Sequence, residues 1–128
     1  MKRGKIDISQ LKTLPEKHEL ETADHLADLG YDIEFIAPRN SPNLRTPDIF
    51  MDGASWEIKC PKGKSKRTIE NNFRKAKEQA ANIIFDLRRI NISEEKCLQE
   101  LERRFAQKVD VKRLLIIKKN GEILRFSR

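Results

Sequence analysis

Residues 47–59 read Pro-Asp-Ile-Phe-Met-Asp-Gly-Ala-Ser-Trp-Glu-Ile-Lys, and this stretch predicts a β-hairpin. Two short apolar runs flank an Asp-Gly pair, which favours a tight turn between antiparallel strands. Side chains two positions apart on a strand point to the same face, so Glu57 and Lys59 share a face and Ile58 points to the opposite one. If Asp48 lies across from them, two carboxylates and one ammonium converge on a patch that could hold a divalent metal and a water, as phosphodiester hydrolysis requires.

The composition favours a basic surface on one compact domain. The chain has 128 residues, and its 27 Lys and Arg against 20 Asp and Glu give a net charge of +7. Such a surface suits a polyanion such as DNA, RNA or an anionic membrane, although it could equally keep a small domain soluble. No apolar run approaches the roughly 20 residues of a membrane span, and no apolar segment of a signal peptide follows the basic N-terminus.

The chain is expected to form a loosely attached lead-in over residues 1–14 and a single domain over residues 15–128. The two cysteines, Cys60 and Cys97, form neither a metal-ligand nor a CxxC spacing. Two thiols in a chain of this length do not make a disulfide framework, so a reducing compartment is favoured.

A helix is predicted over residues 15–30, because a proline stands at its start and a glycine at its end. Its buried face carries Leu20, Ala23, Leu26 and Ala27. At 100° per residue, Glu19 lies at the edge of this apolar stripe and Glu21 lies on the solvent side. A carboxylate on a buried face is costly unless it has a partner or a function, so Glu19 is a candidate site residue. The alternative is an acid that stabilises the helix dipole, which describes Glu16 better.

The segment after Lys59 is strongly basic, with Lys62, Lys64, Lys66 and Arg67. It is either a solvated loop or a set of contacts to nucleic-acid phosphates. A second helix is predicted over residues 67–81, and Asn72, Lys75 and Gln79 line one flank of its apolar stripe. Of these, Gln79 is the candidate to face the hairpin and bind the substrate or the attacking water.

The remaining elements predict an α/β fold. Strands are expected over residues 31–36, 82–87, 113–118 and 122–126, and a third helix over 93–108. The apolar run at 82–87 is typical of a strand buried on both faces, and 122–126 is expected at a sheet edge. The loop at 38–47, rich in Pro, Asn and Ser, could form a rim of the site. Strands separated by helices indicate a mixed β-sheet flanked by helices.

The hairpin resembles the signature of the PD-(D/E)XK nuclease superfamily, since Pro47-Asp48 is followed after eight residues by Glu57-Ile58-Lys59. A preceding helix with an acidic residue (Glu19 here) and a following helix with Gln79 complete the pattern. The resemblance covers residues 16–88 and implies a restriction-endonuclease-like core.

A narrower resemblance is to the tRNA nuclease toxin domains at the C-terminus of contact-dependent growth inhibition (CdiA-type) proteins. It is carried by residues 19–34, 46–49, 56–59 and 76–80. It implies a toxin that is part of a larger secreted protein, acts in the cytoplasm of a target bacterium and is neutralised by a cognate immunity protein.

The resemblance also implies roles for the candidate residues. Asp48 and Glu57 would ligate Mg²⁺ (or Mn²⁺) together with the backbone carbonyl of Ile58, and Glu19 would complete the site directly or through water. Lys59 would hold the attacking water or stabilise the pentavalent phosphate. The residues implied in nucleic-acid binding are Lys62, Lys64, Lys66, Arg67 and Lys75.

Four other interpretations remain open. The domain could be a DNA endonuclease of the same fold or a non-catalytic nucleic-acid-binding module. The pair Glu57 and Lys59 could be a surface ion pair worth at most about 1 kcal/mol. His18 and His25 lie outside the apolar stripe and matter only if RNA is cut without metal, through its 2′-hydroxyl and a general acid or base.

Overall fold

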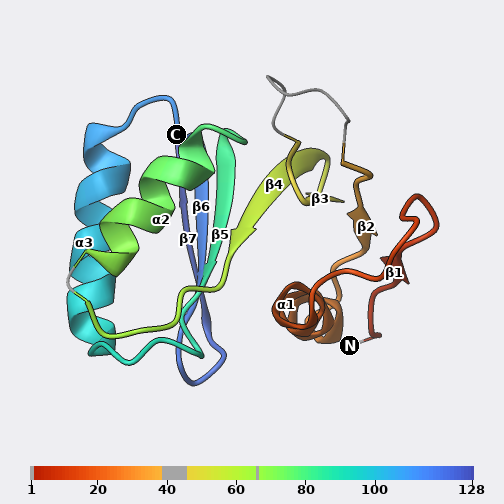
Figure 1. The fold of residues 1–128 in the computed structure, drawn as a ribbon, viewed down its shortest axis with the longest axis horizontal. Helices are drawn as coiled ribbons and strands as arrows, with labels where there is room; N and C mark the ends of the chain where they lie inside the picture. The colour runs from red at the N-terminus through yellow and green to blue at the C-terminus, as the bar shows by residue number, and fades with distance from the viewer. Residues whose placement is uncertain (1, 39–45, 66) are drawn as a thin grey trace.

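The computed structural model describes residues 2–38, 46–65 and 67–128. Within these residues the chain forms seven strands and three helices, labelled in Figure 1. The elements in chain order are β1 (Ile6–Asp7), α1 (Lys17–Asp28), β2 (Ile33–Phe35), β3 (Ile49–Met51), β4 (Ala54–Lys59), α2 (Thr68–Lys77), β5 (Asn82–Asp86), α3 (Glu94–Gln107), β6 (Arg113–Ile117) and β7 (Ile123–Ser127).

The strands form one mixed sheet whose order follows the chain, from β1 at one edge to β7 at the other. Strands β4, β5 and β6 pair in parallel, as do β1 and β2, and the three remaining pairs are antiparallel. The predicted α/β class, the mixed sheet and the edge position of the last strand are therefore confirmed.

Helices cover the two faces of the sheet at opposite ends, with α1 beside β1–β4 and with α2 and α3 beside β5–β7 (Figure 1). Two apolar cores result. Ile84 and Leu115 belong to the core under α1, while their neighbours Ile83, Phe85 and Leu114 belong to the core under α2 and α3. Because side chains alternate along a strand, β5 and β6 supply both cores. This explains why the run at 82–87 is apolar almost throughout.

The predicted hairpin is present as β3 and β4, with the turn at Asp52 and Gly53. Both residues have positive φ, 55° and 76°, as a type I′ turn requires. Glycine adopts this conformation at no steric cost, and aspartate is among the few other residues that tolerate it.

Two expectations need correction. The lead-in is not loosely attached, because β1 pairs in parallel with β2 and the Gly4 amide donates to the Ala27 carbonyl at 2.7 Å. Arg3 also forms ion pairs with Asp24 and Asp28 at the end of α1. The second predicted helix is shorter than expected: α2 ends at Lys77, so Gln79 lies in the turn that follows it.

Candidate active site

The carboxylate of Asp48 is fixed against the neighbouring strand. The backbone amide of Asp48 donates to the Trp56 carbonyl at 3.0 Å, and Asp48 Oδ2 accepts a hydrogen bond from the Ile58 amide at 2.8 Å. These two contacts place Asp48 beside Glu57, across the hairpin. The side chain of Ile58 points into the core under α1, as the alternation predicted.

Glu57 and Lys59 share the opposite face and meet there. Lys59 Nζ lies 3.3 Å from Glu57 Oε2 and donates to Gln79 Oε1 at 3.5 Å. Glu57 is only 3% exposed, so this is no surface ion pair. Its second oxygen, Oε1, is buried and has no hydrogen-bond partner among the described residues. A buried carboxylate oxygen without a partner is costly and marks a position where a ligand would be stabilised.

The two carboxylates disturb each other's ionisation. Burial, together with the neighbouring charge of Asp48, raises the pKa of Glu57 to about 8. Burial also raises the pKa of Asp48, although hydrogen bonds with the Ile58 amide and the Glu57 side chain, together with the Lys59 ammonium, oppose that shift. Since two adjacent carboxylates resist ionising together, the pair retains a proton near neutral pH.

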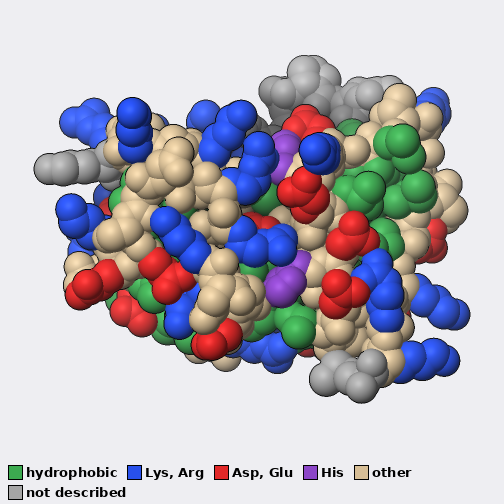
Figure 2. All heavy atoms as spheres, turned by 90° about the horizontal axis from the view of Figure 1, so that it is seen from below, with side chains coloured by type: hydrophobic (Ala, Val, Ile, Leu, Met, Phe, Trp, Pro, Cys, Tyr) green, Lys and Arg blue, Asp and Glu red, His purple; other side chains and the backbone are tan. Residues whose placement is uncertain are grey.

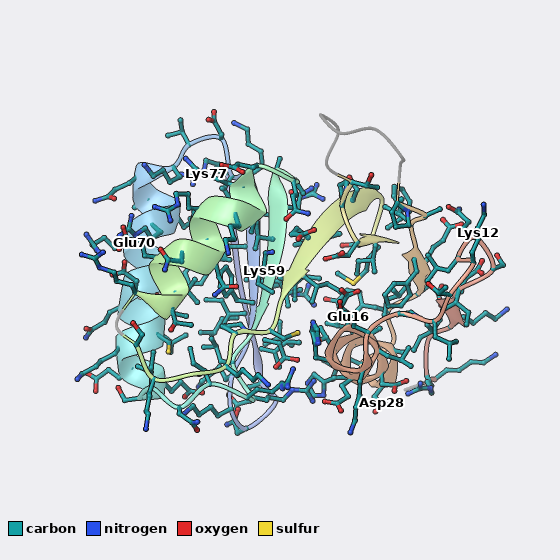
Figure 3. The ribbon with its side chains drawn as sticks, in the orientation of Figure 1. Lys12, Glu16, Asp28, Lys59, Glu70 and Lys77 are labelled. Carbon is teal, nitrogen blue, oxygen red and sulfur yellow. The ribbon has the colours of Figure 1, made fainter. Side chains whose placement is uncertain are left out.

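Glu19 approaches this pair from α1. It is half-buried, whereas Glu21 is exposed, as helical phasing predicted. Burial raises the pKa of Glu19 to about 7, and repulsion from Asp48 and Glu16 adds to the shift. Glu16, Glu19 and Asp48 line a common cavity of about 460 Å³. Figure 3 shows the start of α1, with Glu16, facing the end of β4 that carries Lys59.

A second group of ligand atoms gathers on the first turn of α1. One ligand atom each from Glu16, His18 and Glu19 lies within 4.8 Å of the others, an arrangement that could hold a metal ion. From the sequence, Glu16 was expected to stabilise the helix dipole, and His18 was expected to be a poor candidate for a ligand. In the sequence, the only indication of this group was that Glu16, His18 and Glu19 stand within one helical turn. His25 is directed elsewhere, with Nε2 2.7 Å from the Gly121 carbonyl oxygen.

Buried polar contacts that the sequence analysis missed fasten α1 to the sheet. Thr22 Oγ1 donates to Asp86 Oδ2 at 2.7 Å and lies 3.1 Å from Cys60 Sγ. Arg88 donates to both oxygens of Asp86, at 2.9 and 2.7 Å. In the sequence, these contacts were indicated by a threonine on the apolar stripe of α1 and by an aspartate at the end of an apolar strand.

The thiol beside the site is not a nucleophile. Burial raises the pKa of Cys60 to about 12, so the thiol stays protonated at neutral pH. Cys60 and Cys97 are both free cysteines.

The candidate nucleic-acid-binding residues are exposed: Lys62, Lys64, Arg67 and Lys75. Lys66 lies outside the described residues, as do residues 39–45 of the expected rim loop. Seen from below, the molecule shows many Lys and Arg side chains interspersed with carboxylates (Figure 2). The structure thus leaves these cations available to a polyanion.

Residues 45–123 match the family model for the contact-dependent growth inhibition CdiA C-terminal domain. The chain belongs to this family. The matched segment of this CdiA C-terminal domain contains Asp48, Glu57, Lys59 and Gln79, whereas α1 with Glu19 lies outside it.

The fold of this CdiA C-terminal domain is similar to that of a chain in a solved complex. That complex is the CdiA-CT/CdiI toxin and immunity complex from Burkholderia pseudomallei, with a TM-score of 0.69 and 19% sequence identity over 98% of this chain and 100% of that chain. At this identity the likeness shows the fold alone. No curated protein matches the chain. In the described parts of the chain, none of the helices has the length and apolar character that crossing a bilayer requires.

Proposed function

We propose that this CdiA C-terminal domain is a toxin that hydrolyses phosphodiester bonds as a metal-dependent nuclease of the PD-(D/E)XK type. The observation that carries the proposal is the meeting of Asp48, Glu57 and Lys59 on one patch. There Glu57 is buried and one of its oxygens has no partner among the described residues. An ion pair that served only stability would not need a second, half-buried carboxylate beside it.

The donor set fits a hard divalent cation. Burial raises the pKa values of Asp48, Glu57 and Glu19, and repulsion from Asp48 adds to the shifts of Glu57 and Glu19, so a cation would relieve both costs. Carboxylate and carbonyl oxygens suit Mg²⁺ or Mn²⁺. We assign Asp48, Glu57 and the Ile58 carbonyl as ligands, with Glu19 acting directly or through water. When bound, such an ion acts as a Lewis acid toward the phosphate and lowers the pKa of water.

The protein's own groups would orient the reactants. Lys59 is held between Glu57 and Gln79, which fixes its ammonium at the edge of the carboxylate patch. A fixed cation there can stabilise the charge that develops on the phosphate or position the attacking water. Gln79 would hold Lys59 in place and offer its amide to the substrate.

We propose tRNA as the favoured substrate, with DNA as the alternative. The net charge of +7 and the exposed cations after β4 support a polyanionic substrate. The preference for tRNA rests on the resemblance to tRNA nuclease toxin domains. We assign phosphate contacts to Lys62, Lys64, Lys66, Arg67 and Lys75.

We further propose that a cognate immunity protein binds this domain. The support is the likeness of its fold to a chain of a toxin and immunity complex. Membership of the CdiA C-terminal family supports delivery as part of a larger secreted protein, with action in the cytoplasm of the target bacterium.

The deciding experiment incubates the pure protein with total tRNA, a plasmid and single-stranded oligonucleotides, with Mg²⁺, with Mn²⁺ and with EDTA. We expect cleavage of tRNA that EDTA abolishes. Glu19→Gln should reduce cleavage, whereas the matched control Glu21→Gln, on the exposed side of the same helix, should cut normally.

The other outcomes separate the alternatives. Cleavage of the plasmid alone would favour a DNA endonuclease. Binding without cleavage of any substrate would favour a non-catalytic module. Cleavage that persists in EDTA and in Asp48→Asn would leave a nuclease and reject the metal mechanism.

A further inference from the structure

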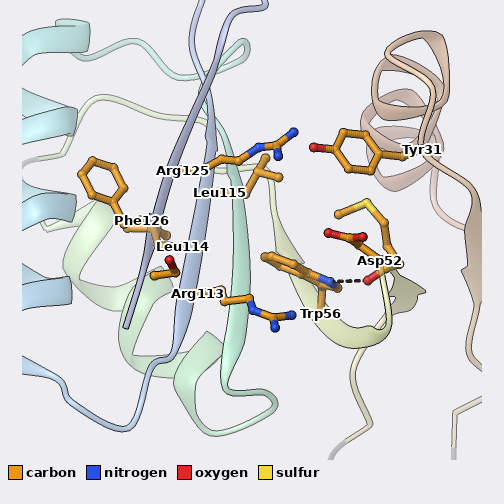
Figure 4. Close-up of a pocket in the computed structure, with 10 residues that line it drawn as sticks. Tyr31, Asp52, Trp56, Arg113, Leu114, Leu115, Arg125 and Phe126 are labelled. Atoms are coloured by element: carbon orange, nitrogen blue, oxygen red, sulfur yellow. Dashed lines mark hydrogen bonds between the residues drawn. The ribbon is translucent and has the colours of Figure 1, made fainter.

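A second pocket, of about 240 Å³, lies on the face of the sheet away from Lys59. Its floor is Trp56 and Leu115, which belong to the core under α1, whereas Lys59 shares the opposite face with Glu57. Tyr31 and the turn residue Asp52 stand on its far side (Figure 4). Because Trp56 and Glu57 are neighbours on β4, this pocket and the catalytic patch of Asp48, Glu57 and Lys59 occupy the two faces of one hairpin.

Two arginines enter this pocket from adjacent strands. Arg113 pairs with Ser127 and Leu115 pairs with Arg125, so the two arginines are diagonal neighbours on the face that carries Leu115. Diagonal neighbours on antiparallel strands are about 7–8 Å apart. Figure 4 shows both side chains extending from β6 and β7 toward Tyr31 and Asp52.

Neither guanidinium forms an ion pair within the described residues, although other arginines do. Arg88 and Arg104, for example, lie 2.7 and 2.8 Å from carboxylate oxygens. Arg125 instead lies over the Tyr31 ring, 5.1 Å from its centroid, a cation–π contact that holds the cation without neutralising it. Asp52 is the one carboxylate among the lining residues, so the pocket carries two positive charges against one negative.

The pocket offers charge rather than a stacking platform. Trp56 is only 5% exposed and donates from Nε1 to the Met51 carbonyl at 2.9 Å. The Tyr31 ring is covered by Arg125. The indole is therefore engaged and one face of the Tyr31 ring is occupied, while two forked donors project over an apolar floor. Such a floor lowers the local dielectric and strengthens the attraction of an anion.

We propose that this pocket binds a phosphate group of the nucleic acid, outside the catalytic patch. The inference rests on the proposed function, because it takes the substrate to be a nucleic acid. Arg113 and Arg125 lie on one face of the sheet and Lys59 on the other, so this contact would be separate from the contacts made at Lys59. Two guanidinium groups above an apolar floor would add a positioning contact to a protein of net charge +7.

Trp56 supplies the readout, since it is the only tryptophan in the chain. The protein, in EDTA to prevent cleavage, is titrated with inorganic phosphate, a single-stranded oligoribonucleotide and polyglutamate while Trp56 emission is recorded. We expect phosphate and the oligonucleotide to change the emission. Arg113→Gln/Arg125→Gln should raise the oligonucleotide Kd by about tenfold and reduce the dependence of log K on log[salt] by about 1. In the presence of Mg²⁺, the double variant should have a higher KM for tRNA and a kcat near the wild-type value.

Arg103→Gln/Lys119→Gln is the matched control, because it removes two exposed cations outside the pocket. Arg113→Gln alone keeps the Tyr31–Arg125 contact and should show part of the effect.

An unchanged emission response in the double variant would overturn the proposal, and a response to polyglutamate alone would overturn it in favour of an acidic protein segment. If the wild type cuts tRNA and the double variant is unaffected, the pocket assignment fails and the nuclease stands. If the wild type cuts nothing but responds to phosphate through these arginines, the pocket stands and the nuclease fails.

Discussion

The hydroxyl of Thr22 lies 2.7 Å from Oδ2 of Asp86, and both residues are almost wholly buried, at 0% and 3% exposed. This hydrogen bond joins α1 to the end of β5. Thr22 stands three residues after Glu19, on the same side of the helix. The position of Glu19 beside Asp48 therefore depends on a contact that touches neither of them.

Thr22→Val should lower the free energy of unfolding by about 1–3 kcal/mol, because it removes a hydrogen bond from a buried carboxylate. Urea denaturation of the two proteins measures the difference. Thr22→Ser keeps the hydroxyl and should recover most of the loss. Equal stability of Thr22→Val and the wild type would show that Arg88 alone satisfies Asp86.

Lys59→Met should reduce kcat by about 100-fold or more while leaving the Kd for substrate nearly unchanged. A fixed cation or water-orienting group contributes roughly that factor to the transition state and little to ground-state binding. Cleavage kinetics and binding in EDTA separate the two effects. Lys77→Met, an exposed residue at the end of α2, is the control. Normal cleavage by Lys59→Met would reject the role proposed for this residue.

The sequence predicted features whose cause is local. Alternation along β4 placed Glu57 and Lys59 together, and helical phasing selected Glu19 over Glu21, because both periods are fixed by backbone geometry. The Asp-Gly turn was predictable for the same reason, since few residues adopt positive φ.

Features that depend on long-range packing were missed or misplaced. The strand β1 has two residues, too few for any periodicity, and exists because β2 offers it an edge. Helix α2 ends before Gln79, although the apolar stripe continues to Ala80. The pocket of Arg113 and Arg125 joins segments far apart in the chain, so no local pattern could indicate it.

The stability of the metal-free protein should fall as pH rises from about 5 to about 8. The folded-state pKa values of Glu19 and Glu57 are raised to about 7 and about 8, above their ordinary value of 4.5. The folded protein therefore holds more protons than the unfolded chain in this range, and stability is lost as those protons leave. Melting temperatures between pH 5 and pH 8.5 in EDTA test this.

Glu57→Gln should reduce the slope of that pH profile, because the amide does not titrate and only the Glu19 contribution remains. Mn²⁺ must displace the proton that Asp48 and Glu57 retain, so the affinity of the wild type for Mn²⁺ should rise with pH over the same range. Calorimetric titration at pH 6 and pH 8 measures the change. A Mn²⁺ affinity independent of pH would contradict the assignment of Glu57 as a ligand.

The cations after β4 should govern the salt dependence of substrate binding. Lys62, Lys64 and Arg67 are exposed, so replacing all three with Gln removes charge without disturbing the core. On a single strand each phosphate contact contributes about 0.7 to the slope of log K against log[salt], so the triple variant should lose about 2. Binding measured from low to high salt in EDTA gives the slope.

The triple replacement of Lys96, Arg103 and Lys119 with Gln carries the same net charge on an exposed surface away from this loop. Its slope should remain close to that of the wild type, because counterion release depends on contacts with phosphate and not on net charge alone. If both triple variants lose the same amount, long-range attraction governs binding and the loop makes no specific contacts. If the slope falls only in the variant of Lys62, Lys64 and Arg67, the segment that follows Lys59 lies on the path of the nucleic acid into the site.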